Sequence, residues 1–302
     1  MKKLISLTSL FLLSCLTVFA QETKKLKEVQ AANLWAPSPI KIDGVLKEWG
    51  DSFQAYNKAT KLYYTISNDD KNIYLAIKST DAVNNNKVTA GGITLTINTD
   101  GKKKEKDAFS LTYPVIQRPT RTMRGPGVGG PGGGGRSVAV TDVVVTGGPG
   151  GPGGQTVDSA MIKAAHERTI AAAKEIKVAG FKDITDSLVS IYNEYGIKAA
   201  IGYNAMGNFT YEMAIPIKLL NLKSDGQELN YNVKVNGIVI PAAMMQAMSE
   251  GGNGGGGGDG QRVVMFGGPG GGGGGPRGGG ASTFQEMTSP SDFWGKYTLA
   301  KK

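Results

Sequence analysis

Tyrosine and asparagine side chains in one stretch of the chain have the chemistry needed to hold a sugar. Tyr192, Tyr195 and Tyr203 lie close together in the sequence, and Asn204 follows directly. A tyrosine ring can stack on the apolar face of a sugar, while hydroxyl and amide groups bond to the sugar hydroxyls. Packing in a core or across strands is the alternative for each ring. We take these four residues and Trp35 as candidate carbohydrate contacts.

Two sets of residues bear on metal binding. Asn98, Asp100 and Asp107 offer oxygen ligands of the kind that calcium prefers, but lysines separate them, and a charged hairpin tip is the alternative. Zinc would need nitrogen or sulfur ligands, and the chain has one histidine, His166, and one cysteine, Cys15. We therefore predict no metal cofactor, with calcium as the open alternative, and we expect His166 to face solvent.

The sequence contains no recognisable catalytic motif. The single histidine is not paired with a serine and an acid in a recognisable context. Carboxylate pairs occur, but none lies in a motif typical of glycoside hydrolysis. The glycine-rich stretches lack the Gly-Lys-Ser/Thr ending of a phosphate-binding loop. The sequence predicts a protein that is not an enzyme.

The first residues have the pattern of a secretory signal peptide. Lys2 and Lys3 form a positive start, residues 4–19 are mainly apolar, and small residues precede a cleavage position after Ala20. The apolar run is short for a membrane span, which needs roughly 20 residues. Cys15 gives a poorer match to a lipidation motif. We predict export to an extracytoplasmic compartment (periplasm, cell surface or medium) and no transmembrane span.

An excess of positive charge accompanies this export signal. The chain has 34 lysines and arginines against 25 acids, which gives a formal net charge of +9. A basic exported protein is suited to anionic surfaces such as polysaccharide or lipid headgroups. The basic residues are scattered, however. The densest run, at residues 102–104, is diluted by Glu105 and Asp107, which is typical of a solvated hairpin tip.

Glycine divides the chain into globular and low-complexity parts. Most of the 45 glycines lie in two tracts, residues 125–154 and 251–280. Such segments gain too little burial to offset their ordering entropy, so we predict two disordered loops inserted into one domain. Each tract holds a short apolar island that could add an edge strand. Too few arginines adjoin the glycines for an RNA-binding segment, and we expect no nucleic acid partner.

Alternating apolar residues predict strands in the rest of the chain. Period-two alternation marks a strand with one face on a core and one face toward water. The predicted inward positions form four sets: Ile73, Leu75 and Ile77; Ile93, Leu95 and Ile97; Phe209, Tyr211, Met213 and Ile215; and Tyr231, Val233 and Val235. This pattern predicts a mainly β fold of two antiparallel sheets packed as a sandwich, jelly-roll or immunoglobulin-like.

One segment departs from the strand pattern. Residues 157–177 are rich in Ala, Lys and Glu, which predicts a peripheral helix capped by Asp158. Its apolar residues can share one face: Met161, Ala165, Ile170 and Ala173. The expected organisation is a signal peptide at 1–20, a leader at 21–37 and one sandwich domain at 38–302, which this helix and the two glycine tracts interrupt.

Several motifs follow one another in a characteristic order. Residues 40–49 read IKIDGVLKEW, an Ile-Asp-Gly turn followed closely by a tryptophan, and residues 209–216 read FTYEMAIP. Between them, residues 62–81 form a strand, a polar hairpin and a second strand that ends in an acid. Together with segments 229–239 and 291–295, these motifs resemble family 9 carbohydrate-binding modules and their DOMON-like relatives.

The resemblance implies a β-sandwich fold and carbohydrate binding. It also implies fold-building roles for five residues: Asp43, Gly44, Trp49, Glu212 and Pro216. The Asp-Gly pair suits a tight turn, and the tryptophan ring can be buried against a sheet. Sugar-binding members of the family clamp a sugar between two tryptophans, and in this chain tyrosines would take that place.

Haem is a second ligand that the resemblance raises, because some DOMON-like relatives hold it inside the sandwich. Axial ligation requires His or Met, and filling a core is the alternative for methionine. The candidates are Met206, Met213, Met244, Met245 and Met248. We expect an exported non-catalytic protein that binds polysaccharide or cell-envelope glycan. The alternative is a surface-interaction protein that acts through its glycine-rich arms.

Overall fold

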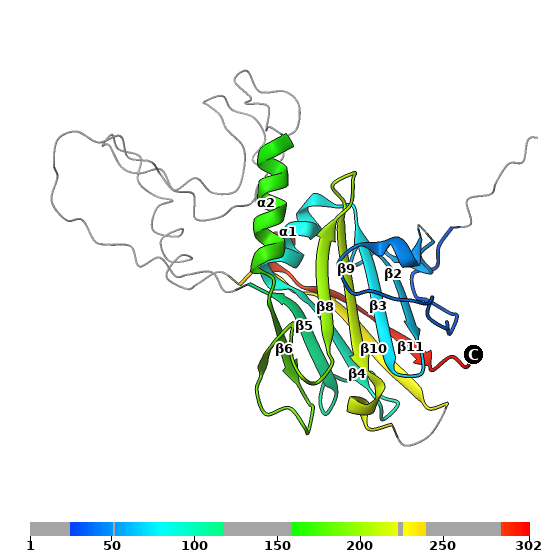
Figure 1. Ribbon diagram of the computed structural model, residues 1–302. Coiled ribbons are helices and arrows are strands. Elements are labelled where there is room, and N and C mark those ends of the chain that lie inside the picture. Colours follow the sequence, from blue (N-terminus) through cyan, green and yellow to red (C-terminus); the bar gives the residue numbers. More distant parts are fainter. Residues whose placement is uncertain (1–24, 51, 117–158, 223–225, 240–284) are drawn as a thin grey trace, which may run out of the picture.

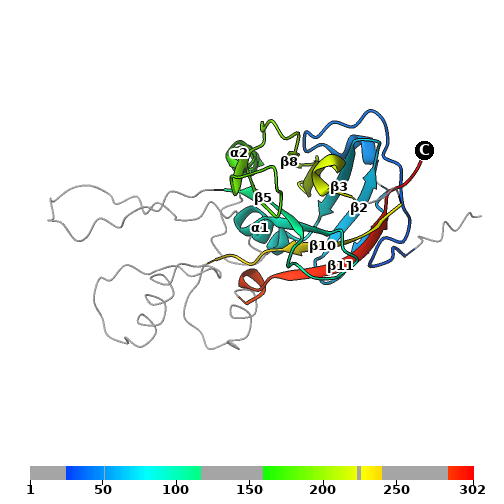
Figure 2. The ribbon, with the colours of Figure 1, turned by 90° about the horizontal axis from the view of Figure 1, so that it is seen from below.

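Two antiparallel sheets face each other in the computed structural model of the protein (Figure 1). The structure describes residues 25–50, 52–116, 159–222, 226–239 and 285–302. Viewed along the layers, β2, β3 and β8 lie on one side, and β5, β10 and β11 lie on the other (Figure 2). The predicted mainly β, two-sheet antiparallel sandwich is confirmed.

Each sheet combines strands from distant parts of the chain. One sheet contains β1 (Ala55–Asn57), β2 (Leu62–Asn68), β3 (Asn72–Ser79), β8 (Lys198–Tyr203) and β9 (Phe209–Pro216). The other contains β4 (Ile93–Asn98), β5 (Phe109–Val115), β6 (Glu175–Ala179), β7 (Leu188–Ser190), β10 (Glu228–Val235) and β11 (Ser291–Thr298). Their orders are β1-β2-β3-β9-β8 and β11-β10-β4-β5-β6-β7. The paired strands run antiparallel.

The alternation in the sequence determines the core. Every residue of the four predicted inward sets belongs to one buried apolar cluster between the sheets. Tyr64 of β2 and Tyr231 of β10 meet across this core, with their hydroxyl oxygens 3.1 Å apart. Because a buried hydroxyl is costly without a partner, this pairing lets two large rings fill the interior.

β9 is buried on both faces, which differs from the half-exposed strand that alternation predicted. All eight of its residues are buried, including Thr210, Glu212 and Ala214, which point away from the core. The cause lies in a distant segment of the chain. A second, smaller apolar cluster on this outer face joins sheet residues to the N-terminal segment: Ala36, Ile40, Ile42, Trp49, Tyr74 and Ala214.

The predicted helix at 157–177 is correct in type and too long at its C-terminal end. α2 (Ser159–Ala172) lies beside β8 at the edge of the sandwich (Figure 1), and the chain then continues as β6, which pairs with β5. Ala165 and Ala173 are buried. Met161 and Ile170 are 65% and 41% exposed, so the apolar residues of this segment are buried only in part.

Three short helices, all within the described residues between 46 and 220, were not predicted from the sequence. α1 (Ala82–Gly91) connects β3 to β4, and its first turn is capped by Asp81, whose carboxylate accepts a hydrogen bond from Asn84 N at 2.8 Å. The 3-10 helix η1 (Leu46–Trp49) lies in the N-terminal segment, and η2 (Ile217–Leu220) follows β9. α1 contacts β5 and β10 and therefore belongs to the sandwich.

The expected boundary at residue 38 does not separate a leader from the domain. Gln30 is 5% exposed, and its side chain pairs with both backbone groups of Ile66 on β2, at 2.8 and 2.7 Å. Its backbone N–H also donates to Tyr64 Oη at 2.9 Å. The described part of the leader, residues 25–37, is therefore an integral part of the fold.

Several expectations concern residues outside the described ranges. They are the signal peptide at 1–20, the glycine tracts at 125–154 and 251–280, the cap Asp158, and the methionines Met244, Met245 and Met248. Within the described ranges, none of the helices has the length and apolar character to cross a bilayer.

Candidate binding site on the outer face of the five-stranded sheet

Residues 40–50, which we call the strap, cross the outer face of the five-stranded sheet. Ile40, Ile42 and Trp49 pack on Tyr74 of β3 and Ala214 of β9, and the Trp49 and Tyr74 rings lie 6.2 Å apart between centroids. The apolar side chains of the strap thus cover the middle strands of the sheet. The site is built from this segment and the strands beneath it.

Glu212 ties the strap to β9. Its Oε2 accepts hydrogen bonds from the backbone N–H groups of Asp43 at 3.1 Å and Gly44 at 2.8 Å, and its Oε1 accepts one from Trp49 Nε1 at 2.8 Å. The side chain has no exposed surface. A buried carboxylate is tolerated only where donors replace water, and the strap supplies three.

Burial also governs the electrostatics of Glu212. Loss of water raises the pKa of this carboxyl group, and the N–H donors of Trp49, Gly44 and Asp43 oppose the effect without overcoming it. The neighbouring Asp43 uses its Oδ1 to accept a hydrogen bond from Val45 N at 2.9 Å. Both acids are therefore directed at donors of the strap.

Two glycines allow the strap to lie directly on β8. Gly44 has φ +83°, and a Cβ at this position would lie 2.5 Å from Ile201 O. A Cβ on Gly202 would lie 2.5 Å from Gly44 O. Only glycine fits this approach, because real side chains do not tolerate such distances. The sequence pattern suggested a turn glycine at 44 but gave no sign of the matching role of Gly202.

A pocket of about 350 Å³, which we call the Phe53 pocket, opens on one side of the strap. Its lining comes from the strap, the segment before β1, β3, β8 and β9: Gly44, Val45, Leu46, Lys47, Gly50, Phe53, Lys78, Tyr203, Asn204 and Thr210. Lys78 Nζ lies 5.0 Å from the centroid of the Phe53 ring and 5.5 Å from that of Tyr63. The pocket thus joins an apolar wall to amide, hydroxyl and ammonium groups.

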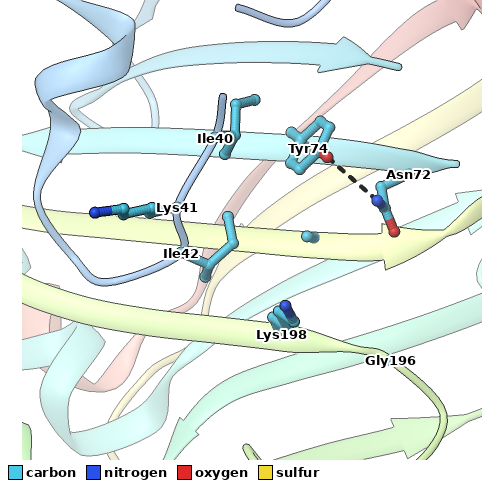
Figure 3. A pocket seen from close by; sticks show the side chains of 8 residues that line it. Ile40, Lys41, Ile42, Asn72, Tyr74, Gly196 and Lys198 are labelled. Carbon is cyan, nitrogen blue, oxygen red and sulfur yellow. Dashed lines mark hydrogen bonds between the residues drawn. The ribbon is translucent and has the colours of Figure 1, made fainter. Parts of the chain in front are cut away.

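A second pocket of about 310 Å³, the Tyr74 pocket, lies on the other side of the Glu212 anchor. It is lined by Ile40, Lys41, Ile42, Asn72, Tyr74, Gly196, Lys198 and Ala214 (Figure 3). Tyr74 donates from its hydroxyl to Asp69 Oδ2 at 2.7 Å and accepts from Asn72 Nδ2 at 3.2 Å. Burial, followed by the bond to Asp69, raises the pKa of Tyr74 to about 12. This ring is therefore a fixed part of the pocket wall.

The candidate sugar contacts do not form one platform. Tyr203 and Asn204 both line the Phe53 pocket, and the ring of Tyr203 is also stacked on His166, with centroids 3.5 Å apart and planes within 3°. Burial raises the pKa of Tyr203 to about 12, and it lowers the pKa of His166. One face of Tyr203 is therefore covered, and His166 is not the solvent-facing residue that we expected.

The remaining candidates lie elsewhere. Tyr192 is 82% exposed, and Tyr195 packs against the core, both in the segment that precedes β8. Because β8 has six residues, this segment is roughly 16 Å from Tyr203. Trp35 is half-buried, and its backbone forms an isolated bridge with Asn68 of β2. By contrast, the fold motif does assemble, since Asp43, Gly44 and Trp49 all bond to Glu212, and Pro216 ends β9.

The sequence did not point to Lys47, Lys78 or Phe53. Lys78 occupies an outward position of β3, so alternation alone could have placed it on the outer face. Lys47 and Phe53 lie outside the alternating segments, and only the course of the strap brings them to the pocket. The Phe53 pocket is thus assembled by tertiary structure.

The structure places the residues that we considered for metal or haem binding in other surroundings. Asn98 Oδ1 accepts hydrogen bonds from the backbone N–H groups of Asp100 at 2.9 Å and Lys102 at 3.3 Å, which holds the β4–β5 turn. No group of three or more His, Cys, Asp and Glu side chains is arranged for a metal ion within the described part of the chain. Met213 is buried in the core, and Met206 is 77% exposed in the β8–β9 turn.

Comparison of the chain with protein-family models, with curated proteins and with solved structures finds no match. The resemblance to family 9 carbohydrate-binding modules and DOMON-like domains therefore stays a prediction made from motifs.

Proposed function

We propose that this protein is an exported, non-catalytic carbohydrate-binding protein, and that its ligand lies in the Phe53 pocket. The observation that carries the proposal is the composition of this pocket, which places an apolar wall opposite hydrogen-bonding side chains. A sugar ring presents the same combination of an apolar face and a polar edge. The volume of the Phe53 pocket, about 350 Å³, is at the lower end of the roughly 300–1,000 Å³ typical of small-molecule sites.

The polar groups of the pocket have hydrogen-bonding capacity left for a ligand. Asn204 Oδ1 accepts from Met206 N at 3.0 Å and Asn208 N at 2.9 Å, and its Nδ2 has no partner among the described residues. Thr210 Oγ1 donates to Gly44 O at 2.6 Å, which leaves its lone pairs as acceptors. One donor and one acceptor can thus bond to adjacent sugar hydroxyls.

The apolar wall is supplied by the strap and the segment before β1. Val45 is 58% exposed, which is high for an aliphatic side chain, and Leu46 and Phe53 line the pocket beside it. Contact with the C–H face of a sugar would remove this surface from water. The secretory pattern of residues 1–20 and the motif resemblance agree with an extracytoplasmic binding protein.

A glycan array on the mature chain, read with and without calcium, tests the proposal. Asn204→Asp keeps the Oδ1 acceptor that the turn needs and replaces the Nδ2 donor, so we expect glycan binding to fall about tenfold or more. Asn221→Asp makes the same chemical change at an exposed position after η2 and is the matched control. Equal binding by both variants and the unmodified chain would contradict the assignment of this pocket.

Deletion of both glycine tracts separates this proposal from a role for the arms. We expect the chain without residues 125–154 and 251–280 to retain its glycan binding. Binding that disappears with the tracts while the sandwich stays folded, as judged by circular dichroism, would favour the surface-interaction function instead.

A further inference from the structure

Among the described residues, the charged side chains that line the two pockets are all lysines. Lys47 and Lys78 belong to the Phe53 pocket, and Lys41 and Lys198 belong to the Tyr74 pocket. Neither lining includes an Asp or Glu among the described residues. Both pockets lie on the same sheet face, on either side of Glu212, so the face between strap and sheet presents positive charge in two places.

Three acids near these pockets accept hydrogen bonds from neutral donors. Glu212 and Asp43 accept hydrogen bonds from the strap, as described above. Asp69 accepts from Tyr74 Oη and from the backbone N–H groups of Lys71 and Asn72, each at 2.7 Å. These carboxylates are satisfied by neutral donors and are not held in salt bridges with the pocket lysines.

Some lysines on other surfaces of the domain have acidic partners. Lys58 pairs with Glu28 at 2.6 Å, Lys296 pairs with Glu228 at 2.7 Å, and Lys61 pairs with two acids. In contrast, Lys41, Lys47 and Lys198 have no carboxylate within salt-bridge distance in the described ranges. The ammonium groups of these three lysines are therefore available to an anionic ligand.

Lys78 has a fixed position in the Phe53 pocket. Its ammonium group lies over the Phe53 and Tyr63 rings at 5.0 and 5.5 Å, an arrangement that holds a cation against an aromatic face. Lys47, which belongs to the strap, lines the same pocket. An anionic group in this pocket would have two lysines among the residues around it.

We infer that the ligand is an acidic polysaccharide, a polymer of sugars that carry carboxylates, and that Lys47 and Lys78 bind the carboxylate in the Phe53 pocket. This inference rests on the proposed carbohydrate binding and names its substrate class. The outward residues Tyr74 and Lys78 are four positions apart on β3, roughly 13 Å, so one chain can place further carboxylates near the Tyr74 pocket. Several ammonium–carboxylate contacts along one polymer reinforce one another.

The experiment compares polygalacturonate with the same polymer after full methyl esterification, because esterification removes the charge and keeps the sugars. Affinity electrophoresis should show retardation of the full mature chain by polygalacturonate, little retardation by the ester, and weakening as salt is added. Equal retardation in both gels would overturn the inference and leave the proposed carbohydrate binding standing. Binding of neither polymer, nor of any neutral glycan on the array, would overturn both.

Lysine variants distinguish a site from general basicity. Lys47→Gln with Lys78→Gln should weaken polygalacturonate binding about tenfold. Lys78→Arg keeps the positive charge and can also stack on an aromatic ring, so it should retain binding. Lys102→Gln with Lys103→Gln removes the same charge from the exposed β4–β5 turn and should change binding less than about twofold. Equal weakening by the two double variants would contradict a specific site. Since Lys47 is exposed, the single Lys47→Gln variant gives the same test if the double variant folds poorly.

Discussion

The outer faces of the two sheets carry acids in very different settings. On the five-stranded sheet, Glu212 of β9 is fully buried under the strap and receives three N–H donors. On the six-stranded sheet, Glu228 of β10 is 50% exposed and pairs with Lys296 of β11. A carboxylate without water must be met by donors from a particular segment, whereas an exposed acid is satisfied by solvent. Glu212 therefore specifies where the strap lies, and both pockets flank that position.

The largest effect should come from removing this buried acid. Glu212→Ala would leave the backbone N–H groups of Asp43 and Gly44 and the indole N–H of Trp49 without their acceptor, so we expect a loss of about 3 kcal/mol in the free energy of unfolding. Glu228→Ala is the matched change on the other sheet and should cost less than about 0.5 kcal/mol. Urea unfolding followed by circular dichroism gives both values. Similar losses for the two variants would show that the strap is not held by Glu212.

A smaller effect is expected where the strap touches β8. Gly44 and Gly101 both have positive φ, at +83° and +73°, but only Gly44 would press a Cβ onto a backbone atom, Ile201 O at 2.5 Å. Gly101→Ala should cost about 1 kcal/mol for the left-handed backbone alone. Gly44→Ala adds the clash and should cost about 2–3 kcal/mol. If the two thermal denaturation curves coincide, the strap does not approach the strand this closely.

The smallest effect concerns pH. Because the pKa of Glu212 is raised in the fold, the folded state holds this proton more tightly than the unfolded chain does. Its contribution to stability is therefore complete below the ordinary glutamate pKa and is lost as pH rises through the raised value. Glu212→Gln lacks this titration, so the difference in unfolding free energy between the unmodified chain and the variant should shrink from about pH 4 to about pH 7. A difference that grows over this range would contradict the direction of the shift.

The core of the sandwich was predicted correctly from the sequence. Alternation placed residues such as Leu75, Leu95 and Val233 correctly because one face of each strand must be apolar, and this requirement is local in the chain. The same reasoning failed at β9, whose outer face is covered by a segment more than 150 positions away, as the bonds from Gly44 and Trp49 to Glu212 show. The alternation of apolar residues within a strand gives no information about such a distant contact.

Local sequence patterns were also insufficient to predict the helices fully. The amino-acid composition predicted α2, but the predicted helix ran on through Glu175 into β6. Residues 175–179 pair with β5, and the content of Ala, Lys and Glu gives no sign of this pairing. α1 was missed because its Asn-rich sequence has low helix propensity, although Asp81 as a cap and Gly92 as a stop were available signals. The candidate site was predicted least well, since it depends on where the strap crosses the sheet.

Hydrogen–deuterium exchange with a soluble oligogalacturonate tests most directly whether the strap face is the binding surface. The account predicts slower amide exchange on ligand addition in the strap at 44–50, in the end of β3 near Lys78 and in the turn after Tyr203. It predicts no change in β11 on the opposite sheet. Protection confined to β11, or to the glycine tracts at 125–154 and 251–280, would contradict it.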